Sequence, residues 1–489
     1  MKLSNNKSYI LFLIGAYIVF FLAISRNLFT PYLSYDEAGQ FWIAKGLNHD
    51  SEPMSSEKGV LDVIENNKYY NLDPGGFGIL LHYWAFISNH HVWLRMLPFF
   101  FFIGVVVSFI YLSFLWIKNI KIAILMGFIA ILSPKLLYMG FELRAYSMEC
   151  LGTLMGVIAL EKLNTGVTYQ KLLLWSCVFS FFMTSRYSEI LILFVVSLYV
   201  LYLISKSKLT LAQKGFSIFL YSIPLFFTLV YVYFFALVFQ NKDMLELNYL
   251  PYLSRDISIL VELQNVLAIL FLALFLVLLY QRHKYSLVKK YQSLIFVTLT
   301  SNLLFITLSI LGKHPWSLSG YRCISLLVLF IICFVAVISE IVLRAIENSN
   351  IFLFYLLSSF IAFILYLSYD NLFVRSDYRY NEFYGNLTKL DFTKYNRVLV
   401  EYTEAPAIKY LYEYGKFQNK KERVYPNKFS FQRGRVHPIS KNKTEFLEIS
   451  KDTIMKYDLL IMPAFTMNYN YQDSRFKPIY ATSKFFEKY

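Results

Sequence analysis

Long apolar stretches recur along the chain, and each is near the ~20 residues that an α-helix needs to cross a bilayer. Apolar side chains make up 57% of the 489 residues and charged ones only 16%, which excludes a soluble enzyme of this length. The sequence therefore predicts an α-helical polytopic membrane protein with about eleven transmembrane helices. The predicted spans are 9–29, 93–117, 122–141, 145–161, 171–185, 188–205, 216–239, 263–280, 293–311, 323–343 and 351–368.

The basic residues of the short loops predict the orientation of the chain. Lys2 and Lys7 precede the first span, and every second loop after it contains Lys or Arg, whereas the intervening loops are poorer in cations for their length. Because cytoplasmic loops are the ones enriched in these residues, the N-terminus is expected in the cytoplasm and the C-terminus outside. The alternative of a cleaved signal peptide is disfavoured, since no small-x-small site follows the first span.

The formal net charge of +15 first suggests nucleic acid as a partner. The basic residues are scattered through predicted membrane loops and the tail, and no nucleic-acid-binding module surrounds them, so no nucleic acid partner is expected. The enrichment of cytoplasmic loops in Lys and Arg, together with attraction to anionic membrane lipid, accounts for the charge instead. The four cysteines fall within or beside predicted spans, so no disulfide framework is predicted.

The chain changes character at about residue 369. The membrane domain, 1–368, is followed by residues 369–489, which contain no apolar run long enough to span and are expected to form a small soluble α/β domain outside the membrane. Its predicted elements are a strand at 397–403, a helix at 405–415, a helix near 444–456 and a strand at 458–462. Since it lacks a glycine-rich phosphate loop and a metal-ligand cluster, a structural or acceptor-guiding role is expected.

Two adjacent acids, Asp36 and Glu37, follow the first span. Ser34 and Glu37 have the S-x-x-E spacing of a capping box, in which Glu37 bonds back to the Ser34 backbone at the start of a helix. Asp36 is not needed for that cap. The external loop that contains these acids, 30–92, is expected to hold aromatic helices in the membrane interface, one after Asp36 and one around His82.

Ionisable side chains are costly in a bilayer, so their positions near span ends indicate where chemistry or binding occurs. In the expected topology these residues all lie toward the external side, unlike the midplane groups of a secondary transporter. They are Arg95, Lys135, Glu142, Arg144, Glu149, Arg186, Glu189, Lys313 and Arg322.

The segment that opens the fourth predicted span is the richest in such residues. If a helix starts near Glu142, then Tyr146 and Glu149 share a face with it, and Arg144 projects from a neighbouring face. Two carboxylates and a tyrosine would then line one wall of a site. The alternative is that Glu142 and Arg144 solvate a helix end, and that Glu149 pairs with a basic neighbour such as Arg186.

Three motifs occur in a defined order relative to the predicted spans. They are YDEA at 35–38 after the first span, DPGGFGILLHYW at 73–84 followed by WLRMLP at 93–98 before the second, and SPKLLYMGFELRAYSM at 133–148 at the start of the fourth. Together they resemble the polytopic GT-C glycosyltransferases that use polyprenyl-phosphate sugars, the group of aminoarabinose transferases and protein O-mannosyltransferases. The chain departs from that group in having Pro-Gly-Gly where Pro-Pro is usual, and Tyr321 followed by Arg322 where Arg-Tyr is usual.

The resemblance implies a GT-C-like fold and an inverting membrane glycosyltransferase. The donor would be a polyprenyl-phosphate-linked sugar, and the acceptor a hydroxyl of a lipid, glycan or protein at the extracytoplasmic (periplasmic) face of the inner or plasma membrane. Asp36 would act as the base, and Glu142 would position the acceptor or share a divalent metal ion, a cofactor that the sequence leaves open. The expected substrate-binding residues are Glu37, His82, Arg95, Arg144, Tyr146, Glu149, Arg186, Lys313, Tyr321 and Arg322.

Two other classes of function stay open. A transporter or flippase of lipids or sugars would require polar groups at the midplane or inverted repeats, and neither is visible in the sequence. A noncatalytic membrane scaffold would tolerate neutralisation of Asp36, which separates it from the transferase.

Overall fold

The computed structural model describes the chain in segments. The described residues are 6–47, 58–71, 73–240, 290–311, 313–314, 316, 321–347, 394–395, 397–401, 405–414, 429–432, 456, 458–461, 476–478 and 485–488. The chain divides into two compact units. The first comprises Met1–Ser25, Asn67–Phe77 and Met96–Phe373, and the second comprises Arg26–Asn66, Gly78–Arg95 and Val374–Tyr489.

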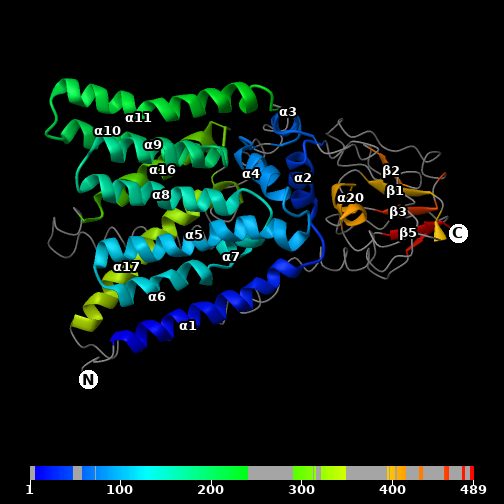
Figure 1. The fold of residues 1–489 in the computed structure, drawn as a ribbon, viewed down its shortest axis with the longest axis horizontal. Coiled ribbons are helices and arrows are strands. Elements are labelled where there is room, and N and C mark those ends of the chain that lie inside the picture. The colour runs from blue at the N-terminus through cyan, green and yellow to red at the C-terminus, as the bar shows by residue number, and fades with distance from the viewer. Residues whose placement is uncertain are drawn as a thin grey trace. The chain divides into compact units, whose positions relative to one another are not determined.

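The first unit is built from helices that run alongside one another (Figure 1). They are α1 (Asn6–Ile24), α5 (His91–Ile117, from Met96 onward), α6 (Ile120–Leu132), α7 (Pro134–Phe141), α8 (Tyr146–Asn164), α9 (Tyr169–Met183), α10 (Tyr187–Lys206), α11 (Leu211–Val232), α16 (Gln292–Ile310) and α17 (Ile324–Glu347). A π-helical turn, η2 (Tyr233–Leu237), continues α11, and a short 3-10 helix, η3 (Tyr321–Cys323), precedes α17. Helices α8 and α10 lie at the centre of the unit, because each packs against the other and against α9, α16 and α17.

Four described helical segments are long and apolar enough to cross a bilayer: His91–Ile117, Tyr187–Lys206, Leu211–Leu237 and Gln292–Ile310. Two shorter apolar helical stretches are Leu13–Phe29 and Ile324–Glu340. The chain is therefore a helical membrane protein, as the sequence predicts. The predicted spans 263–280 and 351–368 lie outside the described residues.

The predicted span 122–141 is not a single helix. It is broken at Ser133 into α6 and α7, and Pro134 occupies the first position of α7. Proline has no N–H group and its ring clashes with the carbonyl of the preceding turn, so the first position of a helix suits it well. The break leaves α7 as an eight-residue helix with Glu142 as its C-cap.

Two glycines on α8 allow α10 to approach closely. A Cβ atom on Gly156 would lie 3.1 Å from the Val196 side chain, and one on Gly152 would lie 2.6 Å from Glu189 Oε1. Small residues four positions apart commonly permit such contacts between membrane helices, because the backbones can then come together. The contact brings the first turns of α8 and α10 beside each other.

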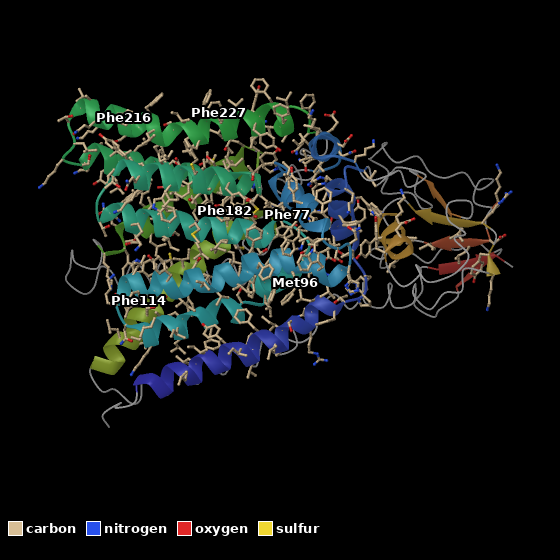
Figure 2. The ribbon with its side chains drawn as sticks, in the orientation of Figure 1. Phe77, Met96, Phe114, Phe182, Phe216 and Phe227 are labelled. Atoms are coloured by element: carbon tan, nitrogen blue, oxygen red, sulfur yellow. The ribbon has the colours of Figure 1, made fainter. Side chains whose placement is uncertain are left out.

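The outer face of α11 is apolar and exposed. Phe216 and Phe227 are 52% and 66% exposed, and Figure 2 shows both on the outer side of the helix. Tyr221 is buried instead, and its hydroxyl lies 2.8 Å from Ser197 Oγ on α10. An apolar outer face with polar contacts kept inside is the pattern expected where a helix meets lipid.

The second unit combines most of the segment between α1 and α5 with the C-terminal segment. Its helices are η1 (Ser25–Phe29, from Arg26), α2 (Tyr35–Ala44), most of α3 (Val60–Tyr70) and of α4 (Gly76–Ala85), and α20 (Ala405–Glu413). Its strands are β1 (Val398–Glu401), β2 (Phe429–Gln432), β3 (Leu459–Ile461), β4 (Phe476–Pro478) and β5 (Phe485–Lys488).

The five strands form one mixed sheet in the order β2-β1-β3-β5-β4. Strand β1 is parallel to both neighbours, with Val398 opposite Phe429 and Leu459, and β5 is antiparallel to β3 and β4. All three residues of β3 are buried, as expected for a strand covered on both faces. The sequence predicts strands at the places of β1 and β3 and a helix at the place of α20, as the structure shows. The predicted helix near 444–456 lies outside the described residues apart from Lys456.

Candidate functional site

Ionisable residues from separate parts of the chain meet in the first unit around Arg186. We call Asp73, Arg144, Tyr146, Glu149 and Arg186 the Arg186 cluster. Asp73 precedes α4, Arg144 precedes α8, Tyr146 and Glu149 lie in the first turn of α8, and Arg186 is the N-cap residue of α10. Four of these five residues are predicted site residues, and Asp73 is the addition.

Asp73 bridges the two arginines of the cluster. Its Oδ1 lies 3.2 Å from Arg186 Nε, and its Oδ2 lies 3.9 Å from Arg144 Nη2. Glu149 Oε2 lies 3.6 Å from the same Arg186 Nε. The Glu149 side chain is fully buried, whereas those of Arg186 and Arg144 are 12% and 18% exposed. The two arginine side chains are therefore mostly buried but keep a small exposed fraction, and a fully buried carboxylate lies against Arg186.

The ring of Tyr146 lies against both guanidinium groups. Arg186 Cζ is 4.5 Å from the ring centroid, and Arg144 Cζ is 6.0 Å from it. Such cation–π contacts contribute about 0.5–2 kcal/mol depending on exposure. Because the ring is itself buried, it limits the positions that the two arginines can adopt.

Helix α8 begins at Tyr146 and not near Glu142. Glu142 is buried at the end of α7 with φ −80° and ψ 128°, and the Arg144 N–H donates to its carbonyl at 2.7 Å. The prediction that Glu142, Tyr146 and Glu149 share a helical face is therefore wrong, because a turn separates Glu142 from the helix. The alternative pairing of Glu149 with Arg186 is confirmed.

Hydroxyl groups donate hydrogen bonds to the two buried glutamates of this region. Ser188 Oγ donates to Glu149 Oε1 at 2.5 Å, and Thr153 Oγ1 donates to Glu189 Oε2 at 2.7 Å. Both glutamates are fully buried. A buried carboxyl group without hydrogen-bond donors destabilises a fold, so these hydroxyls are part of what keeps the acids at the first turns of α8 and α10.

The carbonyl group of Asp73 is held from two sides. It accepts hydrogen bonds from Asn67 Nδ2 at 2.8 Å and from Gln240 Nε2 at 2.9 Å. Tyr187 OH donates to the Oε1 atom of the same Gln240 at 2.7 Å, which fixes the amide orientation. Gln240 follows the π-helical turn η2, a local widening that changes the register of the following residues and is common near functional sites.

The residues after Asp73 form a tight turn against α9 and α11. Gly75 has φ +94°, a backbone conformation that residues other than glycine rarely adopt. The Pro74 carbonyl accepts from Tyr231 OH at 3.3 Å, and the Gly76 N–H donates to the Thr184 carbonyl at 2.9 Å. The turn is thereby fixed before α4 begins.

Gly76→Ala is expected to destabilise the protein. A Cβ atom there would lie 1.9 Å from Thr184 Oγ1 and 2.8 Å from the Thr184 carbonyl oxygen, so the turn or the end of α9 must shift. Overpacking of this kind typically costs about 1–3 kcal/mol. Thermal unfolding in detergent measures the loss, with Gly15→Ala as the control because nothing lies within 4 Å of a Cβ there. Equal stability of the two variants would contradict the close packing.

In the second unit, Glu37 and Arg95 form a fully buried ion pair. Arg95 Nε donates to Glu37 Oε1 at 3.0 Å, and Arg95 Nη2 donates to Oε2 at 2.9 Å, with both side chains 0% exposed. Arg95 Nη1 also donates to the Thr30 carbonyl at 2.6 Å. The Ser34 N–H donates to Glu37 Oε2 at 2.9 Å, so the predicted capping box is confirmed. The pair ties the start of α2 to the start of α5.

Asp36 lies next to Glu37 in the first turn of α2 but is exposed. The cap and the buried ion pair both use Glu37. One acid of the adjacent pair therefore supports the fold, while the other faces solvent.

Glu37→Gln is expected to destabilise the protein strongly. The cap alone is worth roughly 1 kcal/mol, but breaking a buried pair leaves an uncompensated charge on Arg95 and typically costs about 3–5 kcal/mol. Chemical unfolding measures the difference. Asp62→Asn is the matched control, because Asp62 also accepts a backbone N–H at a helix start, from Gly59 at 3.2 Å, but is only half-buried. A loss no larger than that of the control would contradict the role of the ion pair.

Comparison of the chain with models of known protein families gives no match, and comparison with curated proteins gives none either.

The predicted site residue His82 is buried within the second unit. Its Nδ1 lies 2.7 Å from the carbonyl oxygen of Ala44 at the end of α2, and its ring contacts Phe86 with the centroids 4.7 Å apart. These contacts give His82 a structural role in joining α4 to α2.

The later predicted residues lie between α16 and α17. Lys313 is exposed in a bend after α16, and Arg322 is half-buried in η3. Tyr321 also belongs to η3, and its side chain lies outside what the structure describes.

Two acids near the motifs, Glu37 and Glu149, are a poor fit to the role of metal ligand. Both Glu37 carboxylate oxygens bond to Arg95, and Glu149 accepts from Ser188 and pairs with Arg186. Within the described parts of the chain, no group of three or more His, Cys, Asp and Glu side chains is placed to hold a metal ion.

In the sequence, Asp73 stands out only as the first residue of the DPGG motif, and no ionic role is predicted for it. The available signal was an acid directly before Pro-Gly-Gly, in a chain where acids are sparse. Asn67 and Gln240 carry no such signal, because uncharged amides are ordinary in loops and at helix ends.

Proposed function

We propose that this chain is an integral membrane glycosyltransferase of the GT-C type. It transfers a sugar from a polyprenyl-phosphate donor to an acceptor hydroxyl, with inversion, at the extracytoplasmic face of the inner or plasma membrane. In this proposal the chain has eleven spans and a cytoplasmic N-terminus, and residues 369–489 form an external α/β domain.

The observation that best supports the proposal is that residues of the three motifs are joined by ion pairs. Glu37 of YDEA pairs with Arg95 of WLRMLP, and Asp73 of DPGG lies beside Arg144 of the third motif. Each contact lies within one compact unit. Motifs that resemble one family and are also coupled in space are more informative than three separate short matches.

The proposed reaction needs a base and a stabiliser of the leaving group. The acceptor oxygen attacks the anomeric carbon while the bond from that carbon to the phosphate oxygen breaks on the opposite face. Asp36 takes the hydroxyl proton, and the phosphate leaves with the bonding electron pair as an anion that requires no protonation. The sugar configuration is therefore inverted.

The Arg186 cluster suits the departing phosphate. Two guanidinium groups, held by Asp73, Glu149 and Tyr146, offer planar donor forks that match phosphate oxygens. Preorganised donors of this kind are worth roughly 3 kcal/mol each in other enzymes. Lys313 and Arg322 are further candidates for phosphate contact, and Glu142 for placing the acceptor.

The buried residues of the predicted set take a different role. Glu37, Arg95 and His82 are each less than 5% exposed, so we assign them to holding α2 and not to direct contact with substrate. The Glu149 carboxylate likewise acts through Arg186, since it is fully buried behind it.

Transfer assays in proteoliposomes test the donor class. Protein reconstituted with a radiolabelled polyprenyl-phosphate sugar and an acceptor extract is expected to form labelled product, whereas the same sugar supplied as a nucleotide conjugate is not. A panel of lipid-linked hexose, pentose and amino sugars then identifies the donor. Transfer from the nucleotide sugar in the absence of lipid carrier would contradict the proposal.

A further inference from the structure

The C-terminal helix α20 packs against α2, although the two helices are far apart in sequence (Figure 1). Phe41 and Trp42 of α2 are 0% and 1% exposed. The ring centroid of Phe41 lies 5.2 Å from that of Tyr410 and 5.6 Å from that of Tyr414. This contact between aromatic side chains is internal to the second unit, and Ile408 and other apolar residues of α20 are buried with it.

Two hydrogen bonds fix the register of this contact. Trp42 Nε1 donates to the Pro406 carbonyl at 2.9 Å, and Tyr410 OH donates to the Asn89 carbonyl at 2.8 Å. Burial raises the pKa of Tyr410, so its hydroxyl stays protonated and remains a donor. Helix α20 thereby joins α2 to the segment that follows α4.

Helix geometry places Asp36 on the far side of α2 from α20. Successive residues turn by about 100°, so Phe41 and Trp42 lie about 140° and 240° around the helix axis from Asp36. Asp36 is accordingly exposed while the opposite face is buried. The first turn of α2 is fixed by the Glu37–Arg95 pair and its later turns by α20, so both ends of the helix are held.

We propose that α20 is a positioning element that fixes α2 and, through it, the direction of Asp36. This inference rests on the proposed function, in which Asp36 is the base. It assigns the C-terminal segment a part in the reaction although α20 supplies no reacting group. A base requires such support, because a displacement of about 1 Å at a reacting centre can reduce the rate roughly 100-fold.

Hydrogen exchange of the full chain in nanodiscs tests the structural part of this inference without any substrate. In Tyr410→Ala, the amides of α2 are expected to exchange at least about tenfold faster than in the wild type, because the helix can open locally. Glu413→Gln, on the same helix, is the control and is expected to leave α2 exchange unchanged. Wild-type exchange in Tyr410→Ala would overturn the proposal.

A second variant keeps the test decisive if Tyr410→Ala does not fold. The double substitution Trp42→Phe and Tyr410→Phe removes both hydrogen bonds but keeps an aromatic ring at each position. The amides of α2 are again expected to exchange faster than in the wild type. Unchanged exchange would overturn the proposal.

Transfer kinetics separate positioning from a general loss of stability. We expect kcat to fall up to about 100-fold while the KM for donor lipid stays within about twofold, because donor binding does not involve α20. Faster α2 exchange with unchanged kcat would overturn the positioning role. Absence of transfer by the wild-type chain would instead overturn the proposed function, and the exchange data would still decide whether α20 holds α2.

Discussion

Asp36→Asn is expected to abolish sugar transfer while leaving the fold intact. The substitution removes the basic oxygen and keeps the shape of the side chain, and loss of a general base typically lowers kcat by about 10²- to 10⁴-fold. Stability is expected to change little, because Asp36 is exposed and the buried contacts at the start of α2 belong to Glu37. Initial rates with saturating donor lipid, together with a thermal unfolding curve, measure both effects.

Asp62→Asn is the control for this experiment. Asp62 also lies in the first turn of a helix, α3, and accepts a hydrogen bond from the Gly59 N–H. Loss of the Asp62 carboxylate is expected to leave the transfer rate unchanged. If Asp36→Asn transfers sugar at the wild-type rate, Asp36 is not the base, and a scaffold role for the chain becomes the better explanation.

Arg186→Lys is expected to reduce kcat/KM for the donor by about 10²- to 10³-fold, the usual effect of removing one donor to a developing anion. Lysine keeps the positive charge but loses the planar fork that Asp73 and Glu149 hold through Nε, and it loses the stacking on Tyr146. The expected loss therefore comes from geometry and not from net charge.

Arg26→Lys is the matched control, because Arg26 is an exposed arginine in η1. We expect wild-type kinetics for that variant. A wild-type kcat/KM in Arg186→Lys, measured over a range of donor concentrations, would show that the Arg186 cluster is a structural ion-pair network and does not hold the leaving phosphate.

The features that sequence analysis predicts correctly are local. The capping box of Ser34 and Glu37 involves residues three apart, and their spacing alone specifies the bond that the structure contains. The four helical segments that are long and apolar enough to cross a bilayer are similarly local, since composition over a short window determines them. The strands β1 and β3 are short, but their continuous apolar character distinguishes them from the surrounding polar tail.

The features that sequence analysis misses depend on residues far apart in the chain. The full stabilising role of Glu37 depends on Arg95, and the role of Asp73 depends on Arg186, neither of which is a sequence neighbour. The start of α8 is misplaced for a different reason. Helical spacing from Glu142 fits the sequence, but α7 ends at Phe141 and a turn intervenes before Tyr146.

Strands β2, β4 and β5 carry weak local signals in the sequence. Strand β4 contains Pro478, which has no N–H group for a ladder bond and is tolerated only at an edge. Strands β2 and β5 are four residues each, too short for a clear alternation of polar and apolar side chains. Their places are set by pairing with β1 and β3.

Analysis of both products in reconstituted proteoliposomes tests the transferase reaction most directly. Donor lipid labelled in the sugar and in the phosphate is supplied on the external side, and the fates of the two labels are followed together by mass spectrometry and NMR. The proposal predicts that each sugar transferred releases one polyprenyl phosphate and that the new glycosidic bond has the inverted anomeric configuration. Sugar that crosses the bilayer still attached to its carrier, with no polyprenyl phosphate released, would contradict transfer and indicate a transporter.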